Sequence, residues 1–65
     1  MPPRYVEEIV EFLRVNGPTT QVALAAHFSK WGADDEDLRV ALEWLAHEGR
    51  IDRVQDREER FRLRR

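Results

Sequence analysis

The sequence contains no cysteine, which excludes a disulfide and a thiolate metal site. Its two histidines, His27 and His47, do not belong to a cluster of Asp, His or Cys at the spacing of metal ligands. The three glycines fall at predicted turns and helix ends, so no glycine-rich phosphate loop follows a strand. We therefore expect no catalytic residue, no metal, no cofactor and no small-molecule substrate, and the chain is not predicted to be an enzyme.

Long hydrophobic runs are also lacking. No stretch approaches the ~20 apolar residues that a membrane span needs, and the N-terminal Met-Pro-Pro-Arg-Tyr lacks the apolar centre of a signal peptide. These features predict a cytoplasmic protein with no membrane contact. The 65 residues predict one domain, spanning 1–65. A core of this size supplies only roughly 3–5 kcal/mol of stability.

Charge is abundant but unevenly distributed. Charged residues make up 37% of the chain, and the net charge is −2. Residues 1–49 hold four basic and nine acidic side chains, whereas residues 50–65 hold seven arginines and four acidic side chains. The C-terminal segment is therefore a local basic region on an acidic body.

Apolar spacing predicts three helices. The first ends at about Val15, before Asn16-Gly17-Pro18, and Thr19 or Thr20 caps a short second helix. Asp34 or Asp35 caps the third, and Gly49 ends it in a left-handed conformation. The apolar positions expected in the core are Val6, Ile9, Val10 and Leu13, then Leu24, Ala25 and Phe28, then Leu38, Ala41, Leu42 and Leu45.

Two strands are expected after the third helix, at Ile51–Val54 and Arg60–Arg64. The segment between them lacks an Asn-Gly or Gly-Gly signature, which favours a four- or five-residue loop. A third strand of one or two residues is expected near Pro18 to Thr20. In the long turn of residues 29–33, we expect Trp31 to fold back over the core and Gly32 to permit the reversal.

The third helix and the hairpin carry a family resemblance. The order Leu-Arg-x-Ala-Leu-x-x-Leu-x-x-x-Gly-x-Ile, from Leu38 to Ile51, resembles the third helix and first wing strand of the winged helix-turn-helix superfamily. The resemblance implies a mainly α fold with a small β-hairpin (α+β), in which three helices pack on a two- or three-stranded wing. It also implies DNA binding, as a transcriptional regulator or an architectural factor.

DNA contact is the first functional hypothesis. Arginines that alternate along the second strand share one face, and each guanidinium can donate two hydrogen bonds to a phosphate. The competing interpretation is a solvated edge strand that is protected by charge. The predicted nucleic-acid contacts are Lys30, Arg39, Glu43, Arg53, Arg57, Arg60 and Arg62.

A protein-interaction module is the alternative, because the outward side of the third helix is acidic and repels phosphate. Its predicted contacts are Glu36, Val40, Trp44 and His47. Tryptophan is frequent at interface hot spots, although Trp44 packed against the wing or the first helix is the simpler interpretation. A homodimer through Val40 and Trp44, or through Tyr5 and Phe12, is a third alternative.

Overall fold

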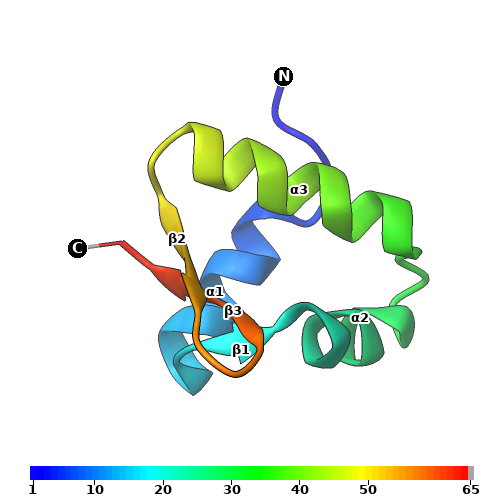
Figure 1. Cartoon of the computed structure of the whole chain (residues 1–65). Helices are drawn as coiled ribbons and strands as arrows, with labels where there is room; N and C mark the ends of the chain where they lie inside the picture. Colours follow the sequence, from blue (N-terminus) through cyan, green and yellow to red (C-terminus); the bar gives the residue numbers. More distant parts are fainter. Residues whose placement is uncertain (65) are drawn as a thin grey trace.

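The computed structural model describes residues 1–64 and has three helices and one three-stranded antiparallel sheet. The elements follow the order α1 (Val6–Asn16), β1 (Thr19–Thr20), α2 (Gln21–Ser29), α3 (Asp35–His47), β2 (Ile51–Gln55) and β3 (Glu59–Leu63). The hairpin of β2 and β3 stands at one side of the helices, and α3 leads directly into it (Figure 1). The expected α+β class is confirmed.

Local signals account for the bounds of the helices. Helix α1 ends at Asn16 and is capped by Gly17, whose φ is 78° and whose N–H donates to Leu13 O. The Thr20 side chain caps α2 by accepting a hydrogen bond from Ala23 N at 3.1 Å. Helix α3 ends in a Schellman motif, because Gly49 N–H donates to Ala46 O and Arg50 N–H donates to Leu45 O. Gly49 has a φ of 74°, so the prediction of a left-handed residue at this position is confirmed.

The sheet has the strand order β1-β3-β2. Phe61 of β3 lies opposite Thr19 on one side and Arg53 on the other. Strand β1 confirms the short third strand expected near Pro18 to Thr20. The predicted four- or five-residue loop is wrong, because Gln55 and Glu59 pair with each other and leave only residues 56–58 in the turn.

A single apolar core joins the three helices to the inner face of the sheet. The predicted helical positions are buried in it except Val10 and Ala25, which are partly buried. Ile51 and Phe61 bring the sheet into the same cluster, with exposed fractions of 2% and 1%. Among residues 1–64, no polar or charged residue is buried. The charged and polar side chains described here therefore lie at the surface, on a scaffold that the apolar core holds together.

The prediction for Trp31 is wrong, because this side chain does not cover the core. The backbone N–H of Trp31 donates to Phe28 O at 2.9 Å, and the backbone N–H of Ala33 donates to the same oxygen at 3.2 Å. With Gly32 at a φ of 89°, this turn directs Ala33 inward and leaves Trp31 69% exposed.

In the described part of the chain, no helix has the length and apolar character needed to cross a bilayer.

Candidate functional site

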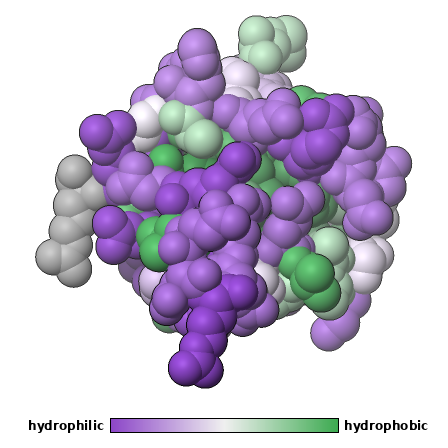
Figure 2. All heavy atoms as spheres, viewed as in Figure 1, coloured by the Kyte–Doolittle hydropathy of each residue, from purple (hydrophilic) through white to green (hydrophobic). Residues whose placement is uncertain are grey.

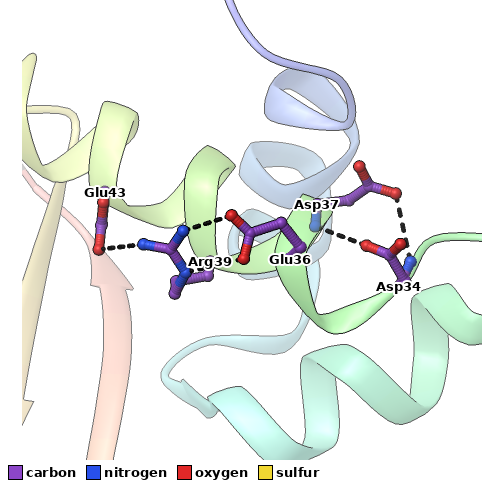
Figure 3. Close-up of polar contacts among 5 residues, drawn as sticks. All are labelled: Asp34, Glu36, Asp37, Arg39 and Glu43. Atoms are coloured by element: carbon purple, nitrogen blue, oxygen red, sulfur yellow. Dashed lines mark hydrogen bonds and ion pairs between the residues drawn. The ribbon is translucent and has the colours of Figure 1, made fainter.

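The outward face of α3 is dominated by an arginine held between two glutamates. Arg39 Nη1 donates to Glu43 Oε1 at 3.0 Å and Arg39 Nε donates to Glu36 Oε2 at 3.1 Å, while Arg39 Nη2 contacts the other oxygen of Glu36 (Figure 3). The hydrogen bond to Glu36 raises the pKa of Arg39 above its ordinary value, and the charges of Glu36 and Glu43 add to this effect. The arginine stays charged, but it already has two carboxylate partners.

Two further carboxylates of this helix hold its N-terminus. Asp37 N–H donates to Asp34 Oδ1 at 2.8 Å, and Asp34 N–H donates to Asp37 Oδ2 at 3.2 Å, which makes a reciprocal capping box. Figure 3 shows this pair at the N-terminal end of α3, next to the Arg39 cluster. With Asp35, the cap and first two-thirds of α3 carry five carboxylates against one arginine. This face has a net negative charge.

The outer face of the sheet has the opposite charge. Burial alternates along β3, with Phe61 inward and both Arg60 and Arg62 exposed. Arg60 Nη2 lies 3.3 Å from Glu58 Oε1, and Arg64 Nε lies 3.9 Å from Asp52 Oδ1. Within residues 1–64, Arg62 has no carboxylate within 4.0 Å. We call Arg60, Arg62 and Arg64 the arginine face.

Arg53 does not belong to the arginine face. It lies opposite Phe61 in the sheet, and its guanidinium carbon is 5.6 Å from the centre of the Phe61 ring. Its Nε is 3.6 Å from Glu59 Oε2. Alternation along β2 from the inward-facing Ile51 would have placed Arg53 on the inner side of the sheet, so the sequence contained this signal.

The remaining predicted nucleic-acid contacts are on separate elements. Arg57 is exposed in the turn between β2 and β3, and Lys30 is exposed at the C-terminal cap of α2. Glu43 is exposed on α3 but bound to Arg39. Arg60 and Arg62 therefore share one face of β3, whereas Lys30 and Arg39 belong to other elements and Arg53 belongs to the opposite face of the hairpin.

A basic residue that the sequence did not single out lies near the arginine face. Arg14 of α1 lines an open groove of about 860 Å³ together with Arg62, Arg64, Gly17 and Asp52. Arg14 also forms an ion pair with Glu11, one turn earlier in α1. The hydrogen bond that Arg14 donates to Glu11 raises the pKa of Arg14 above its ordinary value. Only the packing of α1 beside β3 brings Arg14 to this groove, so sequence spacing gave no sign of it.

The alternative, protein-binding set of residues is only partly exposed. Glu36 and His47 are exposed and Val40 is 38% exposed, but Trp44 is partly buried and packs against the core. The face shown in Figure 2 is mostly hydrophilic, with small and separate hydrophobic areas. Trp44 therefore offers only part of its side chain to a partner, because the rest packs against the core.

The comparisons with known proteins give no further guide to the site. No protein-family model, no curated protein and no solved structure matches this chain. Among residues 1–64 there is also no group of three or more His, Cys, Asp or Glu side chains placed to hold a metal ion.

Proposed function

We propose that this chain is a small winged-helix protein that binds DNA through its wing, the hairpin of β2 and β3, and not through α3. The order of its elements and the pattern from Leu38 to Ile51 support the winged-helix assignment. The observation that carries the DNA-binding proposal is the arginine face: Arg60 and Arg62 lie on one exposed side of β3, and the exposed Arg64 directly follows this strand. Arg14 extends this basic surface across the groove.

The ion pairs of the arginine face do not prevent phosphate binding. The side chains of Arg60 and Arg64 are 52% and 59% exposed, and exposed pairs of this kind contribute only about 0–1 kcal/mol. A phosphate can accept two hydrogen bonds from each guanidinium, which compensates for the lost carboxylate. Replacing a carboxylate by a phosphate as the partner of these arginines therefore costs little free energy.

Helix α3 is a poor partner for DNA by the same reasoning. If Arg39 turns toward a phosphate, Glu36 and Glu43 lose their cation and stand beside the same phosphate. The carboxylates at the N-terminus of α3 add to this repulsion. Binding led by the wing is then largely independent of base sequence, and it weakens steeply with salt. An architectural role agrees better with this mode than reading of a specific operator.

The test is a titration of a short fluorescent DNA duplex in about 50 mM salt, where phosphate contacts are strongest. Replacing Arg60, Arg62 and Arg64 by Gln should remove most of the affinity. Arg53→Gln is the matched control for Arg62→Gln, because it removes the same charge from the inner side of the same hairpin. The proposal fails if the unmodified protein does not bind under these conditions, or if Arg53→Gln weakens binding as much as Arg62→Gln does.

A protein partner at α3 is the second candidate, supported by the acidic cluster alone. Partial burial of Trp44 removes the aromatic anchor that this candidate had from the sequence. The double variant Glu36→Gln with Glu43→Gln separates the two functions, because it should strengthen DNA binding and weaken docking of a basic protein.

A further inference from the structure

A second surface, distinct from the arginine face, lies between α1 and α2. It is a groove of about 320 Å³ whose walls are largely aromatic. Tyr5 and Phe12 come from the α1 side, Phe28 and His27 from α2, and Trp31 from the turn that follows α2. A volume of this size is at the lower end of the range for sites that enclose a ligand or an anchoring side chain.

The base of the groove is a cluster of rings in mutual contact. The Phe12 ring centre lies 4.5 Å from that of His27 and 5.9 Å from that of Phe28. Tyr5 meets Phe28 at 6.2 Å, and His27 meets Phe28 edge-on at 4.9 Å. These are favourable aromatic separations, so the rings support one another in place. The base is therefore formed before any partner arrives.

The outer wall is unusually apolar for a free surface. Trp31 is 69% exposed, and Val15, which also lines the groove, is 68% exposed. Within residues 1–64, the Trp31 ring does not take part in any of these ring contacts. A large exposed tryptophan beside a preformed apolar hollow is typical of an interaction surface.

Charge at the rim indicates what kind of partner fits. Glu8 and Glu11 both line the groove, and no lysine or arginine among residues 1–64 does so. Within residues 1–64, Glu8 makes no ion pair, whereas Glu11 accepts hydrogen bonds from Arg14. A partner with positive charge beside its apolar side chain therefore complements this surface. Two copies related by a two-fold axis here would bring the acidic rims together, which disfavours a homodimer at this groove.

We propose that the groove between α1 and α2 docks an amphipathic segment of another protein. The segment inserts a large apolar side chain between Phe12 and Trp31, and it places lysine or arginine against Glu8 and Glu11. Helical segments bind in this way when apolar residues four positions apart face one groove. This surface shares no residue with the proposed DNA contacts, so either proposal can fail without the other.

The experiment uses the full chain labelled with ¹⁵N and a synthetic helical peptide of about three turns. The peptide carries two leucines in an i, i+4 arrangement with lysines beside them. A second peptide has glutamates in place of the lysines, and a third has serines in place of the leucines. We expect the lysine–leucine peptide alone to shift the Trp31 indole and His27 signals in a saturable titration.

Variants of exposed residues identify the surface without threatening the fold. Trp31→Ala should weaken binding at least about tenfold, and Glu8→Gln about two- to threefold with a smaller salt dependence. Val22→Ala is the matched control, because Val22 is an 80% exposed apolar residue of α2 that does not line the groove. Its affinity should match that of the unmodified chain.

Three results would overturn the proposal. The first is equal binding of the lysine and glutamate peptides, which removes the charge argument. The second is binding that survives Trp31→Ala, or that shifts signals of α3 instead of those of the groove. The third is a concentration-dependent dimer, seen by sedimentation without peptide and lost in Trp31→Ala, because a second copy would then occupy the groove.

Discussion

The N-terminal cap of α3 gives a sharp test of how the acidic residues of this helix divide between folding and function. Asp34 accepts a hydrogen bond from Asp37 N at 2.8 Å. Asp34→Ala removes that acceptor, and loss of such a cap costs about 0.5–2 kcal/mol. We expect about 1 kcal/mol here, because the cap is exposed and water can replace the missing oxygen.

That loss is large for so small a domain. If the free energy of unfolding is about 3–5 kcal/mol, the cap accounts for roughly a quarter of it. In a domain of this size, 1 kcal/mol lowers Tm by about 4–8 °C, which thermal unfolding followed by circular dichroism resolves easily. Urea unfolding at 25 °C should show a lower midpoint with an unchanged slope.

Two variants serve as controls. Asp35→Ala removes the same charge one residue away, but the Asp35 side chain makes no hydrogen bond within residues 1–64, so its Tm should change little. Asp34→Asn removes the charge and keeps a capping oxygen, so most of the stability should remain. The reasoning is refuted if Asp34→Ala and Asp35→Ala lower Tm equally. If Asp34→Asn keeps its stability, the fold needs the capping oxygen of residue 34 but not its charge. If this variant also binds DNA more tightly, the charge of Asp34 opposes DNA binding.

Three further predictions concern the core, the arginine face and pH. Phe61 is 1% exposed, so Phe61→Ala should cost about 3–5 kcal/mol and leave the chain largely unfolded at 25 °C by circular dichroism. Each phosphate contact contributes about 0.9 to the slope of log affinity against log salt, so Arg62→Gln should reduce the measured slope by about that amount and Arg53→Gln should leave it unchanged. The hydrogen bond from Arg14 lowers the pKa of Glu11 from its ordinary 4.5. The Glu11–Arg14 pair therefore stabilises the fold above about pH 4.5 and loses its effect as pH falls through the lowered pKa. As the solution is made more acidic, the urea midpoint of Glu11→Gln should therefore fall less steeply than that of the unmodified chain.

Local sequence signals predicted α3 and its ends well. The apolar stripe and Gly49 act within a few residues of each other, so spacing along the chain is sufficient to identify them. Spacing also limited the cap to Asp34 or Asp35, and the structure shows that it is Asp34. The short strand β1 was also expected. The length of the hairpin loop and the turn before α3 were predicted wrongly. In the turn before α3, hydrogen bonds to Phe28 O decide whether Trp31 or Ala33 points inward. Composition cannot determine that choice.

The candidate sites were less predictable, because they depend on packing between distant segments. Arg60 and Arg62 share a face through strand alternation, which is local. Arg14 joins them only because α1 packs beside β3. The aromatic groove likewise combines Tyr5 and Phe12 with Trp31, and no pattern in one helix reveals such a combination.

The ion pair between Glu11 and Arg14 links the two surfaces. Arg14 lines the groove beside the arginine face, while Glu11 lines the aromatic groove. A phosphate that attracts Arg14 leaves Glu11 free for a cation in the other groove, so DNA and a basic segment should assist each other's binding. An exposed pair contributes little because solvent screens it, which limits this coupling to a few-fold change in affinity. Titrating the lysine–leucine peptide with and without duplex DNA measures the coupling, and it should disappear in Glu11→Gln. Coupling that persists in that variant would show that the ion pair does not carry it.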